Sequence, residues 1–165
     1  MDAAYNQKEH LIQVIEKAFA GVELEDGVSL HQTIEIDNYG HIDKVTRANI
    51  KSDERKDWKK LLDFPALGEI HGIGGLSFYD AKGLRFHLPA YMCLVVQHPE
   101  GEVADSLIFH LTQLSEYNRT RLAILDPYQR KAVAAFLHYI RHNGGNYFKW
   151  EHDTIEKALA DYWSC

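Results

Sequence analysis

The sequence predicts an α+β fold: one mostly helical domain over residues 1–165, with a small antiparallel β-hairpin at about residues 76–88. Apolar residues recur at helical spacing along most of the chain, and one short segment alternates with the period-two pattern of strands. The composition, with 45% hydrophobic and 25% charged residues, is ordinary for a globular domain. Disordered and coiled-coil classes are therefore excluded for the chain as a whole.

The N-terminal third predicts three helical regions. Apolar residues between positions 11 and 19 follow the spacing of an amphipathic helix, and Gly21 lies where that helix would end. Ser29 is placed to cap a second, short helix that ends at Gly40. A third region covers residues 43–62 and contains a break near Ser52.

The C-terminal half predicts further helices. Residues 90–97 are apolar nearly all round, which favours a buried central helix with Pro89 in its first turn. A buried strand is the alternative, because short apolar runs do not distinguish the two. Another helix is expected over residues 106–114. The Asp-Pro pair at 126–127 is a strong helix start, and Asp153 is a candidate cap for the last helix.

The hairpin is predicted from two alternating segments, residues 76–79 and 84–88, that flank Asp80 to Gly83. Asp and Gly at the ends of these four residues suit a type I turn, with Gly83 at positive φ. This turn sets the register and gives the hairpin an apolar and a polar face. The apolar face holds Leu76, Phe78, Phe86 and Leu88. The polar face holds Ser77, Tyr79, Arg85 and His87.

The polar face of the predicted hairpin is the candidate ligand site. Arg85 is suited to bind a carboxylate or phosphate through two hydrogen bonds, and His87 to acid–base work near neutral pH. Ser77 and Tyr79 complete the set. The alternative interpretation is structural: Arg85 stacks on Tyr79 and pairs with a carboxylate elsewhere in the fold.

Other signals of catalysis or cofactor binding are absent from the sequence. His138 and His142 share one helix face, but no Glu follows the first histidine and the pair points toward solvent, so we expect no metal site. The glycine-rich residues 68–75 lack the context of a phosphate-binding loop, and no cofactor is expected. Cys93, inside an apolar run, is expected to be a buried, inert thiol.

Charge and hydropathy indicate the setting in which the chain works. The net charge of −6 and the lack of a basic stripe argue against nucleic-acid binding. The longest apolar run, Ala90 to Val96, is far shorter than the roughly 20 residues of a membrane span. No signal peptide is recognisable at the N-terminus, and the two cysteines form no metal-binding or redox spacing. A cytoplasmic protein is the expectation.

Residues 78–92, FYDAKGLRFHLPAYM, resemble the motif F-Y-D-x-x-G-x-R-F-x-L-P-A-Y-M of an uncharacterised bacterial family. Segments around residues 19–22, 105–108, 125–130 and 160–163 are similar to that family too, so the resemblance spans most of the chain. The resemblance implies no activity, because the family has no known function. Extra residues near 41–56 and 115–120 depart from its pattern.

Two functional hypotheses remain. The first is a non-enzymatic interaction protein, such as an immunity-type or regulatory partner of another protein; the acidic balance suits a basic partner. The second is a small enzyme or ligand-binding domain that recognises an anionic small molecule on the polar face of residues 76–88. A flat acidic surface with exposed aromatic residues would favour the first hypothesis, and a pocket containing Arg85 would favour the second.

Overall fold

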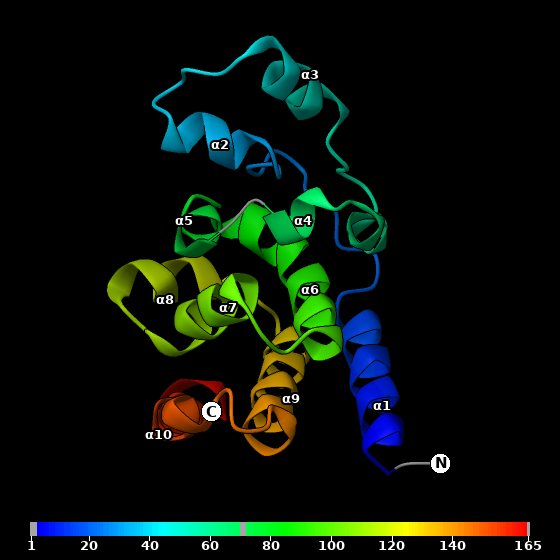
Figure 1. The fold of residues 1–165 in the computed structure, drawn as a ribbon, viewed down its shortest axis with the longest axis vertical. Helices are drawn as coiled ribbons and strands as arrows, with labels where there is room; N and C mark the ends of the chain where they lie inside the picture. Colours follow the sequence, from blue (N-terminus) through cyan, green and yellow to red (C-terminus); the bar gives the residue numbers. More distant parts are fainter. Residues whose placement is uncertain (1–2, 70–71, 165) are drawn as a thin grey trace.

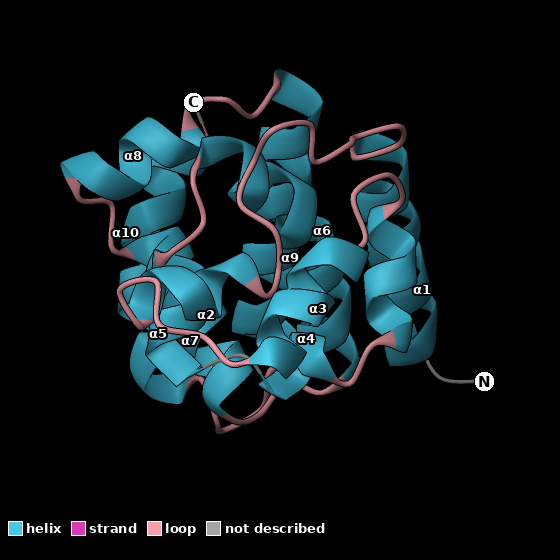
Figure 2. Cartoon of the chain, turned by 90° about the horizontal axis from the view of Figure 1, so that it is seen from above, coloured by secondary structure: helices cyan, strands magenta, loops and turns pink. Residues whose placement is uncertain are grey.

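A computed structural model describes residues 3–69 and 72–164, and every regular element within them is helical (Figure 1). Figure 2 shows helices and loops without a strand in this part of the chain. The first elements are α1 (Ala3–Ala18), α2 (Gln32–Asp37), α3 (Lys44–Ser52), η1 (Trp58–Asp63), α4 (Ala66–Glu69) and α5 (Gly72–Ser77). They are followed by α6 (Ala81–Gln97), α7 (Glu102–Thr112), α8 (Glu116–Leu122), α9 (Pro127–Asn143), η2 (Lys149–Glu151), α10 (His152–Ala158) and η3 (Leu159–Trp163).

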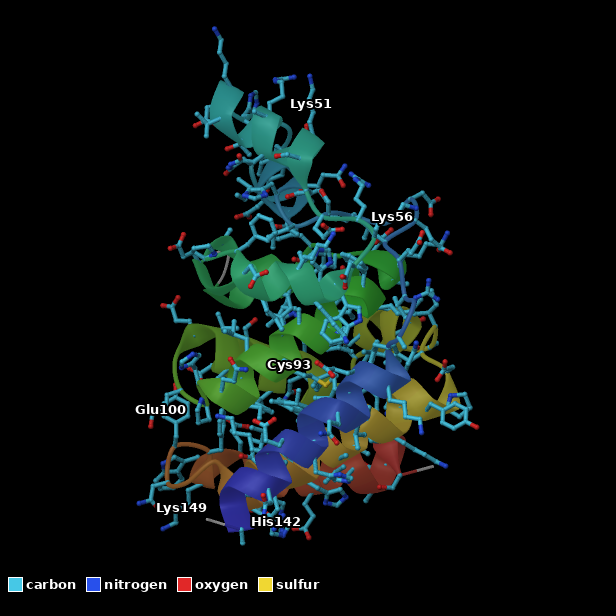
Figure 3. The ribbon with its side chains drawn as sticks, turned by 90° about the vertical axis from the view of Figure 1, so that its right-hand side faces the viewer. Lys51, Lys56, Cys93, Glu100, His142 and Lys149 are labelled. Atoms are coloured by element: carbon cyan, nitrogen blue, oxygen red, sulfur yellow. The ribbon has the colours of Figure 1, made fainter. Side chains whose placement is uncertain are left out.

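Helix α6 lies at the centre of the molecule, in contact with α1, α7, α8, α9 and η1 (Figure 1). Its apolar residues are buried almost all round, and they belong to the same hydrophobic cluster as the inner faces of the surrounding helices. Cys93 lies inside this cluster (Figure 3), and burial raises the pKa of its thiol to about 12. The predictions of a buried central helix and of a buried Cys93 are confirmed.

The predicted β-hairpin is wrong. Residues 72–77 form helix α5, and Ala81–Gln97 form one continuous helix in place of a turn and a second strand. The cap of α6 is Asp80, whose side chain accepts a hydrogen bond from the Gly83 N–H, an arrangement that starts a helix and not a hairpin. The fold is therefore all-helical over the described residues and not α+β.

The division into an apolar and a polar face also fails. Phe86 and Leu88 are buried as predicted, but Tyr79 and His87, both assigned to the polar face, are fully buried as well. The alternation around residues 84–88 misleads because α6 is surrounded by other helices, so a polar side chain at its centre is buried with the rest. Pro89 lies inside α6, several residues past the first turn.

Two of the predicted helix boundaries are confirmed, whereas Ser29 and Asp153 do not cap the helices that they were expected to start. Helix α1 ends before Gly21, whose φ is +74°. Helix α9 begins at Pro127 with a complete capping box, in which Asp126 and Gln129 each bind the other's backbone N–H. Because these start and stop signals are local, they are readable without knowledge of the tertiary packing.

Helices α2 and α3 form an arm at the end of the molecule opposite α10 (Figure 1). None of the residues of α3 is buried, and Lys51 lies at the outer end of the arm (Figure 3). The arm leaves the body after Ser29 and returns at Asp53. Within the described residues, the structure contains no helix with the length and apolar character needed to cross a membrane.

Candidate functional site

Tyr79 and His87, two of the four predicted site residues, form a buried stack with 4.3 Å between ring centroids. The Tyr79 hydroxyl lies 3.1 Å from that of Tyr91. His87 Nδ1 donates to the Gly83 carbonyl, which leaves Nε2 as a buried acceptor without a partner among the described residues. Burial lowers the pKa of His87 to about 4, so the imidazole is neutral near pH 7.

The other two predicted site residues have different neighbours. Arg85 lies 3.4 Å from Glu25 in an ion pair whose side chains are 21% and 50% exposed. The Ser77 hydroxyl is 3.1 Å from Nε2 of the buried His110. None of the four residues lines the hollows described below. A ligand role for Ser77, Tyr79, Arg85 and His87 stays a prediction.

Arg121, which no sequence pattern singles out, is a buried cation. One of its guanidinium nitrogens donates to the carbonyls of Leu76 and Tyr79, at 2.8 and 2.9 Å, and another to Asn118 Oδ1 at 2.7 Å. Its charge also lies over the ring of Tyr117. Arg121 therefore connects α8 to Leu76 in α5 and to Tyr79, which lies between α5 and α6.

His138 and His142 are both exposed on α9, in agreement with their predicted orientation. Their rings stack at 6.5 Å, and His142 Nδ1 donates to the His138 carbonyl. No group of three or more His, Cys, Asp or Glu side chains in the described part of the chain is arranged to hold a metal ion.

A first candidate site, not predicted from the sequence, centres on the buried carboxylate of Asp53. Its side chain is 3% exposed and accepts three hydrogen bonds. The Ser29 hydroxyl donates at 2.6 Å, the backbone N–H of His31 at 2.9 Å, and His31 Nδ1 at 2.5 Å. These bonds close the base of the α2–α3 arm, because Ser29 and His31 precede the arm and Asp53 follows it.

A hollow of about 230 Å³ opens beside this carboxylate. Its apolar side includes Leu61 and Phe64, and its polar side includes Asn49 together with the Asp53–His31 pair. An oriented histidine beside an apolar surface is an arrangement that proteins use for ligand binding and for proton transfer.

A second candidate site lies between α7 and η2, where a notch of about 220 Å³ has an apolar floor and an acidic rim. Ile108 and the buried Phe148 form the floor, and Asp105 and Glu151 supply carboxylates. Phe109 lines the notch while remaining 46% exposed. Exposed aromatic area beside charged groups is typical of surfaces that bind other proteins.

Next to the notch, a larger hollow of about 720 Å³ lies between the end of α7 and α10. The linings of the two hollows share Thr112 and Gln113, so the hollows are adjacent, and together they are here named the α7–α10 groove. Its charged side chains are four carboxylates and two cations, and none of the carboxylates forms an ion pair with a described residue. The carboxylates are Asp105, Glu151, Asp153 and Asp161, and the cations are Arg119 and Lys157.

Further aromatic side chains are close in sequence to residues that line the groove. Trp150 precedes Glu151 in η2 and is 88% exposed. Tyr147 fixes the chain before η2, since its hydroxyl donates to Asp105 at 3.0 Å and accepts from the Gly101 N–H at 3.1 Å. In Figure 3, Glu100 and Lys149 mark the same edge of the molecule. The chain before η2 is thus held in place at Tyr147.

Comparison with known families decides the family of the chain: the model described as Family of unknown function (DUF6714) matches residues 7–165. The chain belongs to this family. Both candidate sites lie within the part of the chain that matches DUF6714. The expectation from residues 78–92 that the chain belongs to an uncharacterised family is confirmed. The motif of that family and its bacterial distribution stay predictions. No curated protein and no solved structure matches the chain.

The two candidate sites differ in how far the sequence alone could have predicted them. The Asp53–His31 pair joins residues separated by 22 positions and belongs to no spacing motif, so no local signal identifies it. The α7–α10 groove has a weak signal: aromatic residues at 147, 148 and 150 lie among charged residues just before the last helix. This signal does not tell which of the aromatic rings is exposed.

Proposed function

We propose that this protein is an interaction module whose α7–α10 groove binds a basic segment of another protein that carries a bulky apolar side chain. The observation that carries the proposal is the notch at the end of the groove. There, exposed Phe109 borders an apolar floor, and the carboxylates of Asp105 and Glu151 lack cationic partners among the described residues.

The chemistry of the groove matches such a segment. An apolar side chain of the partner would lie on Ile108 and Phe148, and the rings of Phe109 and Trp150 would cover it. Lys or Arg beside it would pair with Asp105 and Glu151. Burial of aromatic surface supplies most of the affinity in interfaces of this kind, while charges at the rim favour encounter with the correct partner.

The charge of the whole chain supports a basic partner as well. With a net charge of −6, the molecule repels acidic partners and attracts basic ones over a distance set by the ionic strength. An immunity-type or regulatory protein that covers a basic surface of another protein is a role of this class. Membership of a family of unknown function does not indicate which protein the partner is.

The experiment is a selection of peptides from a random displayed library against the full chain, followed by mapping with amide NMR shifts. We expect enriched peptides to combine Lys or Arg with a neighbouring bulky apolar residue. Their binding should shift the amide resonances of α7, η2 and α10. Enrichment of acidic peptides, or shifts confined to other helices, would contradict the proposal.

Three exposed aromatic residues provide matched variants. Phe109→Ser and Trp150→Ser should each weaken peptide binding by roughly tenfold, a typical cost for an aromatic anchor. Tyr128→Ser, which removes an exposed ring from α9 outside the groove, should leave binding unchanged. Because all three rings are exposed, the variants should fold as the natural chain does, which a thermal melt checks.

A further inference from the structure

The hydrogen bonds of Asp53 determine which nitrogen of His31 carries the proton. An ionised carboxylate only accepts hydrogen bonds, so the 2.5 Å contact places the proton on His31 Nδ1. When the ring is neutral, Nε2 is then an acceptor, and it has no hydrogen-bond partner in the described part of the chain. The bonds from Ser29 and from the His31 backbone keep the carboxylate fixed behind the ring.

The hollow beside His31 offers a matching apolar surface. Leu61 is buried in its wall, and Phe64 is exposed at its mouth. Across the hollow, the carboxamide of Asn49 makes no hydrogen bond to a described residue. A volume of about 230 Å³ suits a molecule of one ring or a short chain, smaller than the drug-sized ligands of typical pockets.

The charges around the hollow disfavour anions. Asp53 and Glu54 line it, and it has no Lys or Arg in its lining. Burial alone would raise the pKa of Glu54, but its carboxylate accepts the backbone N–H groups of Lys56, Asp57 and Arg55, and the net shift is downward. Glu54 therefore stays ionised and adds to the negative potential.

We propose that this hollow binds a small uncharged molecule with an apolar body and an O–H or N–H group, which donates to His31 Nε2. The site is separate from the α7–α10 groove and does not depend on the function proposed for it. The Asp53 bonds by themselves are also consistent with a purely structural clasp at the base of the arm. The free Nε2 and the apolar hollow distinguish the ligand site from such a clasp.

Phenol and toluene are the probes, because they share a ring and differ in one hydroxyl. In amide NMR titrations of the full chain, phenol should shift residues 30–31 and 49–54 and bind roughly five-fold tighter than toluene, the factor supplied by one net hydrogen bond. Benzoate should bind more weakly than either. Absence of saturable shifts up to about 20 mM phenol, or shifts elsewhere, would overturn the proposal.

The variant His31→Asn separates the two roles of the ring. The Asn side-chain N–H takes the place of Nδ1–H and keeps the bond to Asp53, but no acceptor replaces Nε2. We expect a folded chain that binds phenol no better than toluene. A folded variant that keeps the preference for phenol would show that His31 is only structural.

A second measurement covers the case in which His31→Asn does not fold. The ¹⁵N resonances of the His31 ring in the natural chain should show the Nδ1–H tautomer. Addition of phenol should then move the Nε2 resonance, because that atom gains a hydrogen bond, and addition of toluene should not. An Nε2–H tautomer, or an Nε2 resonance insensitive to phenol, would overturn the proposal.

Discussion

Gly27 and Gly83 pack backbone against backbone: a Cβ atom on Gly27 would lie 2.7 Å from the Gly83 nitrogen. A Cβ on Gly83 would lie 2.6 Å from the Val28 carbonyl oxygen. Asp80 completes this contact, since its Oδ1 accepts from the N–H groups of both Gly83 and Val28. The loop before the arm is thereby fixed to the first turn of the central helix.

Gly83→Ala should destabilise the fold by roughly 1–3 kcal/mol, because the added methyl group forces two backbones apart. The reason differs from the one predicted for a hairpin: Gly83 is in helix α6 and not at positive φ. Urea unfolding measures the change. Gly68→Ala is the matched control, since its Cβ would meet only the tip of Leu94 at 3.9 Å, and its stability should change little. Equal losses for both variants would contradict the close packing.

Phe86→Ala should cost roughly 3–5 kcal/mol of unfolding free energy, because Phe86 is fully buried in the centre of α6. Phe109→Ala removes the same ring from an exposed position and should cost less than about 1 kcal/mol. Denaturant unfolding of the two variants gives the comparison. A small loss for Phe86→Ala would mean that α6 is not the centre of the core.

Arg85→Met and Arg121→Met should differ sharply in stability. The Arg85–Glu25 pair is partly exposed and long, so its loss should change the unfolding free energy by less than about 1 kcal/mol. Loss of Arg121 leaves the buried Asn118 oxygen and the Leu76 and Tyr79 carbonyls without their donor, and should cost about 3 kcal/mol or more. Thermal and urea unfolding test both. A larger loss of unfolding free energy for Arg85→Met than for Arg121→Met would show that Arg85 is the structural cation.

His87 should make the fold sensitive to acid. Its pKa falls from 6.5 when exposed to about 4 in the fold, so between these values the unfolded chain binds more protons. The stability from neutral His87 is complete above pH 6.5 and declines as the pH falls to about 4, by roughly 3 kcal/mol in total. His87→Phe, which keeps a ring against Tyr79, should remove this part of the pH dependence. An unchanged profile between pH 7 and 4 would contradict a buried neutral His87.

The sequence was sufficient for those parts of the fold that depend on local signals. The capped start of α9 at Asp126 and the end of α1 before Gly21 required only neighbouring residues. The prediction of a strand over residues 84–88 was wrong, because the same alternation fits both a strand with one buried face and a helix buried on all sides. Only the position of α6 between other helices decides between them, and that position is a property of the whole chain.

The candidate sites were less predictable than the helices. A break in the helical region was predicted near Ser52, and helix α3 does end at Ser52, but the next residue also carries the Asp53 carboxylate that binds Ser29 and His31. Arg85 was interpreted as a structural cation and Arg121 was not considered, although both are arginines on helices. Burial separates them, and burial follows from how α8 packs against α6.

The measurement that tests the proposed interaction most directly is the salt dependence of peptide affinity for the natural chain and for the double variant Asp105→Asn, Glu151→Gln. Both substitutions keep the shape of the notch and remove its charge. At low salt the variant should bind a selected basic peptide roughly five- to thirtyfold more weakly, and salt should affect it much less. Equal affinity and equal salt dependence in the two proteins would contradict the account of the α7–α10 groove as a site for a basic partner.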